Sequence, residues 1–377
     1  MAASLDTSSL PTSLSFKAKQ ALLDQLAWVV SHAQANQGLL YFLPSVGWNI
    51  ASFQRPHHLA RAFASLGWTV VFDVTNARDQ VFGFFQVEPS IFLFKAPPVL
   101  LQGLPAKLVW AFSYNVHQRT LVTPRSLLVY DIIDSLEVFP YPQDLLWKNH
   151  RWGLQFADLV TCVSRGLVKE VAPLRRDALY LPNAAEPARF DTCGVSVKLP
   201  AAFADFLRRF HPRVALYIGS FARWFDFSLM SQVVQQTPEW GFVFVGPVLE
   251  PAWPWDRLWH LPNVFYGGPQ PYAFLPFLIE RCSVGLIPFA GEKVLRGLSP
   301  LKMYEFLAAG KPLVVTPFPE AEGIPGVFMA KSGSEFASQL ELSLKLAPGL
   351  RMPMLAFARR NTWLQRVETV LRHVRLL

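Results

Sequence analysis

The sequence predicts an α/β protein made of two doubly wound, Rossmann-like domains. The chain has 377 residues, more than one hydrophobic core usually supports. Short apolar runs alternate with amphipathic stretches, as they do in parallel α/β sheets. This alternation stops near residues 183–211, where prolines gather, and then starts again. With 51% hydrophobic and 16% charged residues, the composition is typical of a packed globular protein.

An N-terminal extension, residues 1–37, precedes the first predicted strand. Between residues 17 and 32 it carries Leu22, Leu26 and Val29 at helical spacing. Such a helix either covers an edge of the first domain or docks on a membrane. We favour the first alternative.

The first domain is predicted to span residues 38–195 and to hold a largely parallel sheet. Its first two strands and the helix opened by Pro56 form a βαβ unit, and a further helix is predicted over 144–157. Seven runs have the character of strands: 39–43, 68–74, 91–94, 108–111, 127–131, 159–162 and 178–181.

The second domain is predicted to span residues 212–355. Its five strand-like runs are 214–218, 242–245, 264–266, 284–287 and 313–316. The last part of the chain, 356–377, places Trp363 and Val367 on one side of a helix. We expect the strand ends of the two domains to face each other across a cleft, which suits a transfer between two substrates.

Charge and composition exclude several classes of protein. The net charge of +8 suits an anionic substrate or membrane surface, but no nucleic-acid-binding signature accompanies it. Three scattered cysteines favour a reducing compartment, and we find neither a signal peptide nor an apolar run long enough to cross a bilayer. We therefore expect a cytoplasmic protein without a nucleic-acid partner. Contact with the inner face of the plasma membrane is compatible with its charge.

The strongest motif lies between Gly297 and Lys311. Pro300 interrupts the chain just before a helix whose first turns carry Lys302 and Glu305. The helix N-terminus and Lys302 suit a diphosphate, and Glu305 can accept hydrogen bonds from sugar hydroxyls. The alternative is an ordinary amphipathic helix with both side chains solvated. The predicted donor and phosphate contacts of this helix are Ser299, Pro300, Leu301, Lys302 and Glu305.

This motif resembles the donor-binding segment of GT-B glycosyltransferases of family 4, the group 1 type. Segments that start at Gly47, Tyr130, Ala157 and Leu181 are similar, in the same order, to a subgroup that builds surface polysaccharides. The resemblance implies that Glu305 holds the ribose of a nucleotide sugar. The family often has a second glutamate eight positions earlier, where this chain has glycine.

The resemblance also implies roles for residues elsewhere. Arg223 would form a phosphate-binding pair with Lys302, through guanidinium hydrogen bonds. On the acceptor side, Asp134, then Asp131, would orient or deprotonate a hydroxyl, although a capping role is an even alternative for Asp131. His117 is a third catalytic candidate. The predicted neighbours of the nucleotide base are Gly246, Pro247, Phe265 and Tyr266, and those of the acceptor or diphosphate are Gly47 and Trp48.

The predicted function is retaining transfer of a sugar from a UDP- or GDP-sugar to a glycan or lipid-linked acceptor in cell-surface polysaccharide biosynthesis. The sequence has no Asp-x-Asp pair, so we expect no metal, and no cofactor beside the nucleotide-sugar substrate. Two alternatives remain open. One is an inert GT-B scaffold that binds nucleotide or glycan, and the other is a GT-B sugar epimerase.

Overall fold

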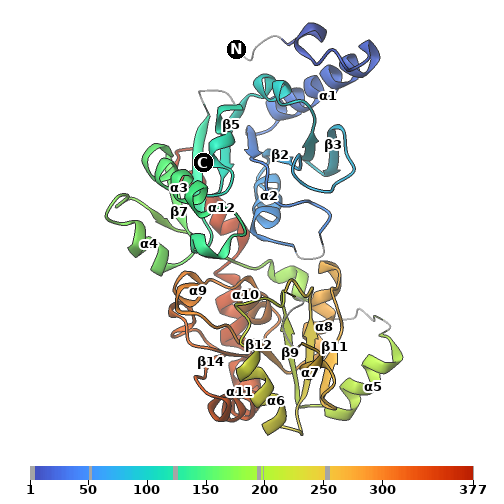
Figure 1. Ribbon diagram of the computed structural model, residues 1–377, viewed down its shortest axis with the longest axis vertical. Helices are drawn as coiled ribbons and strands as arrows, with labels where there is room; N and C mark the ends of the chain where they lie inside the picture. Colours follow the sequence, from blue (N-terminus) through green and yellow to red (C-terminus); the bar gives the residue numbers. More distant parts are fainter. Residues whose placement is uncertain are drawn as a thin grey trace. The chain divides into compact units, whose positions relative to one another are not determined.

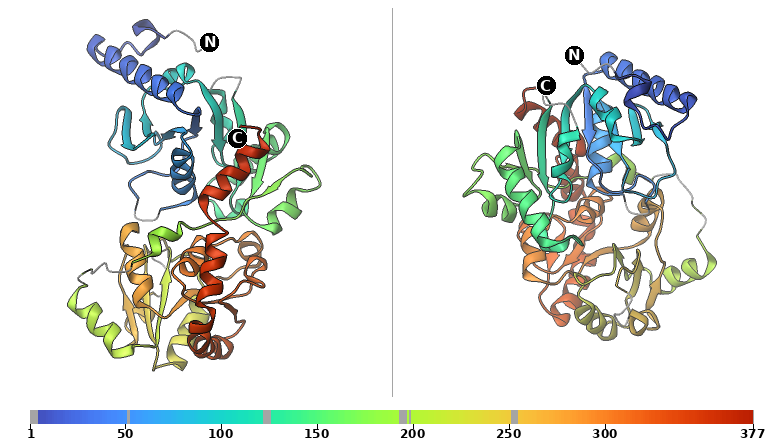
Figure 2. Two further views of the ribbon diagram at one scale, coloured as in Figure 1. Left: turned by 180° about the vertical axis from the view of Figure 1, so that it is seen from behind. Right: turned by 45° about the horizontal axis from the view of Figure 1, so that its top comes forward.

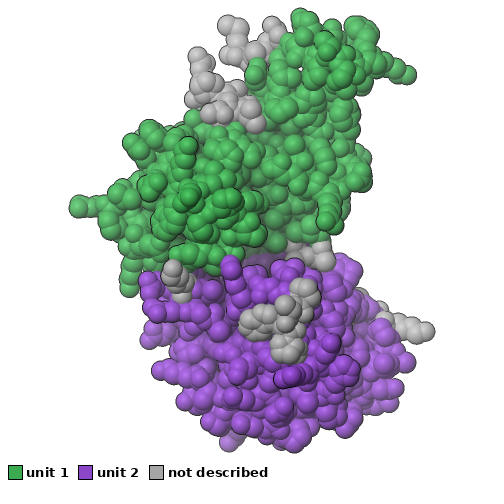
Figure 3. Space-filling view, viewed as in Figure 1, with its two compact units in different colours: residues 1–50, 54–182, 363–377 green, residues 51–53, 183–362 purple. Residues whose placement is uncertain are grey.

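The computed structural model describes the chain apart from residues 1–4, 51–52, 122–125, 193–196, 198, 251–254 and 377. The chain forms two compact units, shown in two colours in Figure 3. Unit 1 comprises residues 1–50, 54–182 and 363–377, and unit 2 comprises residues 51–53 and 183–362. Each unit is built on one sheet of mostly parallel strands, so the predicted α/β fold class is confirmed.

The limits of these units differ from the predicted domain limits at the N-terminus and in the predicted linker. The N-terminal extension is part of unit 1, because Leu22 and Leu26 of helix α1 (Phe16–Ala35) are buried in that unit's core. The chain passes into unit 2 at Asn183. The end of the predicted linker is helix α5 (Ala201–Phe210), whose Phe203 packs against Phe265 at 4.8 Å between ring centroids.

Unit 1 contains an eight-stranded sheet in the order β3-β4-β2-β1-β5-β6-β7-β8 (Figure 1). Its strands are β1 (Leu39–Phe42), β2 (Thr69–Asp73), β3 (Gly83–Glu88), β4 (Ile91–Lys95), β5 (Ala106–Ala111), β6 (Leu127–Ile132), β7 (Leu159–Cys162) and β8 (Leu179–Tyr180). Its other helices are α2 (Arg55–Ser65), α3 (Gln143–Phe156), α4 (Arg165–Val171) and α12 (Trp363–His373). The seven predicted strands are present, and β3 is an addition.

Strand β3 escaped prediction because it is an antiparallel edge strand with two exposed residues in its middle. It pairs with β4 through a tight turn in which Ser90 has a positive φ of 63°. Helix α1 covers one face of this hairpin, where the Gln25 side chain accepts a hydrogen bond from the backbone N–H of Phe84 at 3.0 Å. The extension therefore covers the sheet edge, in line with the favoured alternative.

Unit 2 contains a six-stranded parallel sheet in the order β11-β10-β9-β12-β13-β14. Its strands are β9 (Val214–Ile218), β10 (Gly241–Val245), β11 (Val264–Tyr266), β12 (Val284–Ile287), β13 (Leu313–Val315) and β14 (Val327–Met329). Besides α5, its helices are α6 (Phe227–Gln236), α7 (Trp255–Trp259), α8 (Leu275–Arg281), α9 (Glu292–Gly297), α10 (Leu301–Ala308) and α11 (Gly333–Arg359). Only the short edge strand β14 was not predicted.

Both sheets place their first strand inside the sheet and reverse the strand order there. The reversal lies between β1 and β5 in unit 1, and between β9 and β12 in unit 2. In open α/β sheets, ligands bind outside the carboxyl ends of the strands at such a switch point. The loops that follow β1, β5, β9 and β12 are thus the places to look for a site.

The last helix, α12, returns the chain to unit 1. A break at residues 360–362 separates it from α11, and the backbone N–H of Ala185 donates to the Asn361 carbonyl at 3.1 Å in that break. Helix α12 lies against α2 (Figures 1 and 2). Its buried apolar residues are Trp363, Val367, Val370 and Leu371. No helix in the described part of the chain combines the length and apolar character needed to cross a membrane.

Candidate functional site

In unit 2, the N-terminus of α10 lies at the carboxyl edge of the sheet. Pro300 is the residue before the first helical turn, where its missing N–H costs no helix hydrogen bond. Ser299 is held beside it, because the Asn183 side-chain amide donates to the Ser299 carbonyl at 2.6 Å. Leu301 is half-buried and begins the helix. Asn183 thus fixes residues 299–301, and the first N–H groups of α10 lie at the carboxyl edge of the sheet.

Glu305 and Lys302 form an ion pair on the first turns of this helix. The Lys302 Nζ donates to Glu305 Oε2 at 2.6 Å, as the i,i+3 spacing allows. The Glu305 side chain is 1% exposed and that of Lys302 is 18% exposed. Glu305 is therefore a buried carboxylate whose charge is balanced by a cation that reaches the surface.

Tyr272 completes the cluster from the other side of the sheet edge. It lies in a short helical turn after β11, and its hydroxyl donates to Glu305 Oε1 at 2.9 Å. Burial, together with the neighbouring Glu305 charge, raises the pKa of Tyr272 well above its ordinary value. The phenol thus stays protonated and fixes the direction of the carboxylate.

The ring of Tyr272 is enclosed by aromatic and cationic groups of unit 2. Phe53 stacks on it at 5.2 Å between ring centroids. The Lys302 Nζ lies 5.4 Å and the Arg189 Cζ 5.5 Å from the ring centroid, within the range of cation–π attraction. Lys302 pairs with Glu305, and Arg189 pairs with a second carboxylate, Glu186, at 2.9 Å, so each cation beside the ring has its own acidic partner.

Arg223 lies on the loop that follows β9, at the switch point of unit 2. This loop is tied to the one after β12, because the Asp226 N–H donates to the Pro288 carbonyl at 2.7 Å and the Ala290 N–H to the Trp224 carbonyl at 2.8 Å. Arg223 itself is exposed. The structure thus places Arg223 in the loop after β9 and Lys302 in the first turn of α10, both at the carboxyl edge of one sheet.

The residues predicted near the nucleotide base occupy two different surroundings. Gly246, with a φ of 144°, donates to the Gly268 carbonyl at 2.9 Å and accepts the Tyr266 hydroxyl at 2.8 Å. The Pro247 carbonyl accepts the N–H of Phe221 at 2.9 Å. These three lie together at the strand ends. Phe265 points to the other side of β11, where it packs on α5.

In unit 1, the loop after β1 is held by Asp79. The Asp79 carboxylate accepts the backbone N–H groups of Trp48 at 3.2 Å and Asn49 at 3.0 Å. A side chain at Gly47 would bring its Cβ to 2.5 Å from Asp79 Oδ2, which explains the glycine. His57 Nε2 lies 2.9 Å from the Gly47 carbonyl, while Nδ1 accepts from the N–H of Gln54. Since burial lowers the pKa of His57 to about 4, this imidazole is neutral and its Nε2–H is the donor.

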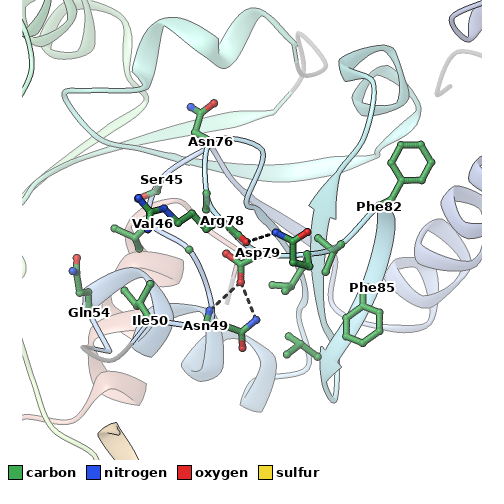
Figure 4. Close-up of a pocket in the computed structure, with 16 residues that line it drawn as sticks. Ser45, Val46, Asn49, Ile50, Gln54, Asn76, Arg78, Asp79, Phe82 and Phe85 are labelled. Carbon is green, nitrogen blue, oxygen red and sulfur yellow. Dashed lines mark hydrogen bonds between the residues drawn. The ribbon is translucent and has the colours of Figure 1, made fainter. Parts of the chain in front are cut away.

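A cavity of about 950 Å³ opens beside this loop, within unit 1 (Figure 4). Ser45, Gly47 and Asn49 line it from the loop, and Asp79 lines it from the segment after β2. The exposed rings of Phe82 and Phe85 form an apolar side. The pocket thus offers both amide and hydroxyl groups and aromatic surfaces. Of the two residues predicted for this loop, Gly47 lines the cavity and Trp48 is buried behind it against His57 and Phe72.

The two aspartates proposed for catalysis lie in different environments. Asp131, on β6, is completely buried and receives hydrogen bonds from Arg55 at 2.8 and 3.1 Å, Trp110 at 3.1 Å and Thr161 at 2.7 Å. The donors are side chains of α2, β5 and β7, so Asp131 holds a buried ion pair inside unit 1 and does not have the capping role that was the alternative. Asp134, after β6, is half-buried. Burial raises the pKa of Asp134 to about 7, against a hydrogen bond from the Ser135 N–H that lowers it.

His117 lies in a short helical turn after β5, near the switch point of unit 1. It is exposed, and its Nδ1 lies 3.1 Å from the side-chain amide of Asn149, which also donates to the Ser113 carbonyl at 2.8 Å. Partial burial lowers the pKa of His117. The catalytic assignments of Asp134, Asp131 and His117 remain predictions.

Sequence reasoning missed four residues that shape these places: Asn183, Tyr272, Asp79 and Arg55. Each acts on a partner at least 30 residues away in the chain. None has a local motif to mark it. Among the described residues, no cluster of three or more His, Cys, Asp or Glu side chains is arranged to hold a metal ion.

Comparison with known proteins gives one similar sequence. No family model matches the chain. It is 32% identical over 171 residues to TuaH of Bacillus subtilis (strain 168), whose name provisionally assigns it as a teichuronic acid biosynthesis glycosyltransferase. The aligned part is 44% of this chain and 42% of TuaH, so the match spans under half the length of that relative.

Solved structures resemble nearly the whole chain. Anabaena Alr3699/HepE, solved in complex with UDP and glucose, has a TM-score of 0.64 at 15% identity and covers 90% of this chain and 99% of its own. Sucrose-phosphate synthase from Thermosynechococcus elongatus has a TM-score of 0.64 at 14% identity, with 89% and 98% covered. The chain therefore has the GT-B glycosyltransferase fold that its motifs predicted.

Proposed function

We propose that this protein is a glycosyltransferase of the family 4 type, which moves a sugar from a nucleotide-sugar to a glycan or lipid-linked acceptor in cell-surface polysaccharide biosynthesis. Its GT-B fold, its similarity to TuaH and its likeness to a structure that holds UDP support the proposal. The observation that carries it is the cluster of Glu305, Lys302 and Tyr272 at the N-terminus of α10, on the switch-point edge of the sheet.

The cluster suits a nucleotide diphosphate for electrostatic reasons. In the structure described here, Lys302 is paired with Glu305, and it has a flexible four-carbon stem that reaches the surface. When a diphosphate arrives, Lys302 can turn to it, and the ribose hydroxyls can donate to the carboxylate oxygen that Lys302 leaves. Tyr272 would hold Glu305 in place during this exchange.

Breakage of the bond between sugar and diphosphate leaves negative charge on the departing group. Lys302, Arg223 and the α10 N-terminus supply positive charge at the same edge of the sheet, which favours a metal-independent departure. Family resemblance favours retention of the anomeric configuration and a UDP- or GDP-linked hexose. We include these three points in the proposal.

Unit 1 would receive the acceptor. The cavity beside the Gly47 loop has hydrogen-bonding groups and aromatic rings, the combination that binds the hydroxyl-bearing and apolar faces of a sugar. Asp134, with a pKa of about 7, is suited to accept a proton from an acceptor hydroxyl near neutral pH. A lipid-linked acceptor would place the protein at the inner face of the plasma membrane.

A nucleotide panel tests the donor site. The purified chain is heated with UDP, GDP, ADP, dTDP or CMP. One nucleotide should increase the free energy of unfolding by RT ln(1 + [L]/Kd) and thereby raise the melting temperature. The shift should disappear in Lys302→Ala. It should persist in Arg208→Ala, which removes the same charge from an exposed i,i+3 pair on α5 of unit 2.

Turnover is then measured with the matching nucleotide-sugars and a lipid extract as acceptor. Release of free nucleotide with incorporation of sugar into the extract supports the proposal. Nucleotide binding without turnover would favour an inert scaffold. If none of the five nucleotides changes the melting temperature, the donor site itself is contradicted.

A further inference from the structure

Helix α3 of unit 1 exposes a row of apolar side chains. Leu145 is 36% exposed and Phe156 is 55% exposed, and the half-buried ring of Trp152 lies 5.2 Å from that of Phe156. Residues 145, 152 and 156 fall within about 40° of one another around a helix. Each is an apolar group that would be expected on the buried side. The remaining side of α3, which adjoins this row and extends to the opposite face, is already packed, with Leu146, Gly153 and Leu154 buried.

A second segment extends this surface. Arg175 Nη1 donates to the carbonyls of Leu154 at 2.9 Å and Ala157 at 2.8 Å, which fixes the loop after α4 at the C-terminal end of α3. The neighbouring Leu174 is 71% exposed. Four apolar side chains from two segments are therefore brought to one part of unit 1.

Cations accompany these apolar groups. Lys148 and Arg151 lie on the exposed side of α3, and Arg176 is exposed beside Leu174. None of these three forms an ion pair with another described residue. By contrast, the acidic Asp177 is paired with Arg175 at 2.9 Å and Asp158 accepts the N–H of Leu128 at 2.7 Å. The exposed Asp144 lies between Lys148 and Arg151 around α3, so the surface carries three cations against this one acid and is net positive next to exposed apolar groups.

Helix α1 shows that exposed aromatic residues alone do not make such a surface. Its Phe16 and Trp28 are 71% and 47% exposed, but their positions lie about 120° apart around the helix, with the exposed Asp24 between them. On α3, Leu145, Trp152 and Phe156 lie in one row, with Lys148 and Arg151 about 60° and 120° from Leu145 on one side of it. A further exposed ring of α3, Trp147, lies about 160° from this row. The apolar row with cations beside it is the pattern of a helix that lies in the interface of a membrane.

We propose that the α3 surface, defined as Leu145, Lys148, Arg151, Trp152, Phe156, Leu174 and Arg176, docks on a bilayer that contains anionic lipids. The apolar side chains enter the region between headgroups and acyl chains, and the three cations contact lipid phosphates. The inference deepens the proposed function and rests on it, since a lipid-linked acceptor gives the protein its reason to be at a membrane. It names the surface that would bring the chain to its substrate.

Vesicle sedimentation with the full chain tests this surface. The probes are phosphatidylcholine vesicles with and without phosphatidylglycerol. We expect the wild type to bind the anionic vesicles, more weakly at high salt. Leu145→Ser/Phe156→Ser should reduce binding at least tenfold, and Lys148→Gln/Arg151→Gln about tenfold or more, since each cation near an anionic surface contributes about 1 kcal/mol. Phe16→Ser on α1 and Arg208→Gln on α5 are the matched controls and should bind like the wild type.

Two results would overturn the inference. One is a wild type that does not bind anionic vesicles, and the other is α3 variants that bind as well as the controls. Each variant is also tested for its nucleotide-dependent melting shift and for turnover with detergent-solubilised acceptor. Retention of both in a variant that has lost vesicle binding supports docking by α3. If the wild type shows no turnover with the solubilised acceptor, the result counts against the proposed function and not against docking by α3.

Discussion

Two buried ion pairs, one in each unit, differ in how completely their carboxylates are satisfied. Asp131 in unit 1 accepts four hydrogen bonds, from Arg55, Trp110 and Thr161, and both charged side chains are at most 5% exposed. Glu305 in unit 2 accepts one from Lys302 and one from Tyr272. A carboxylate has about four acceptor sites, so donors from the described residues saturate Asp131 but not Glu305.

The cations differ as well. Arg55 holds Asp131 with a rigid, two-point fork, and its guanidinium also lies 5.8 Å from the ring centroid of Trp363. Lys302 is a single mobile charge with a route to the surface. The comparison teaches that a buried ion pair can satisfy its carboxylate fully or leave acceptor sites open. In the proposed function, the open acceptor sites of Glu305 are the ones that receive the nucleotide.

The largest effect is expected for Arg55→Met. It leaves the Asp131 charge buried without its partner, which should lower the free energy of unfolding by about 3–5 kcal/mol in urea denaturation. Arg208→Met, from an exposed pair, should change it by less than about 1 kcal/mol. Arg55→Met/Asp131→Leu should recover part of the loss. A loss below about 1 kcal/mol for Arg55→Met would contradict the structural role of this pair.

Glu305→Gln should leave the melting temperature without nucleotide nearly unchanged and weaken nucleotide binding. Hydrogen bonds to a charged group contribute about 1.5–3 kcal/mol, so the affinity for the nucleotide chosen by the panel should fall roughly ten- to hundredfold in titration calorimetry. Asp205→Asn on α5 serves as the control of equal charge. Glu305→Gln could instead destabilise the chain while the protein that stays folded binds nucleotide normally. The Lys302–Glu305 pair would then be structural, like the Arg55–Asp131 pair.

A smaller effect is expected for Tyr272→Phe. It removes the hydroxyl that orients Glu305 but keeps the ring between Phe53 and the two cations. A single neutral hydrogen bond contributes about 1 kcal/mol, so affinity should fall about fivefold. Tyr266→Phe removes a hydroxyl that donates to a backbone carbonyl and should change affinity less. Equal losses in the two variants would count against an orienting role for Tyr272.

The smallest effect is expected for the loss of stability that Asp134 causes as the pH rises. This loss should be absent at acidic pH and should grow toward neutral pH. Burial raises the pKa of this carboxyl from 3.8 to about 7. Between these two pH values, the folded chain therefore keeps a proton that the unfolded chain has lost. The stability that Asp134 contributes is complete below about pH 4 and falls as the pH rises through about 7. Urea midpoints at pH 5 and pH 8 should therefore differ less in Asp134→Asn than in the wild type. An unchanged difference would place the pKa of Asp134 near its ordinary value.

Most of the fold was predictable because it depends on local patterns. Strands such as β1 and β9 are continuous apolar runs. Along the chain, such runs alternate with helices whose apolar residues recur with the helical period. Strand β3 was not predictable in this way, since Phe85 and Gln86 are exposed and a turn, not a helix, joins it to β4.

The site was predictable only where one helix carries it. Lys302 and Glu305 are three residues apart, so a sequence motif displays their pairing. Tyr272 and Arg55 meet their carboxylates 33 and 76 residues away, through sheet order and loop course. No pattern in the surrounding residues encodes those meetings.

The return of α12 to unit 1 has a consequence for the protein during its synthesis. Residues up to Pro182 leave the ribosome first, yet they lack the helix that covers α2. Until residue 363 and the turns after it have emerged, the side of α2 that meets Trp363 faces solvent or a chaperone. The second unit to be translated can complete its own core first, so the first half of the nascent chain is the last to be finished.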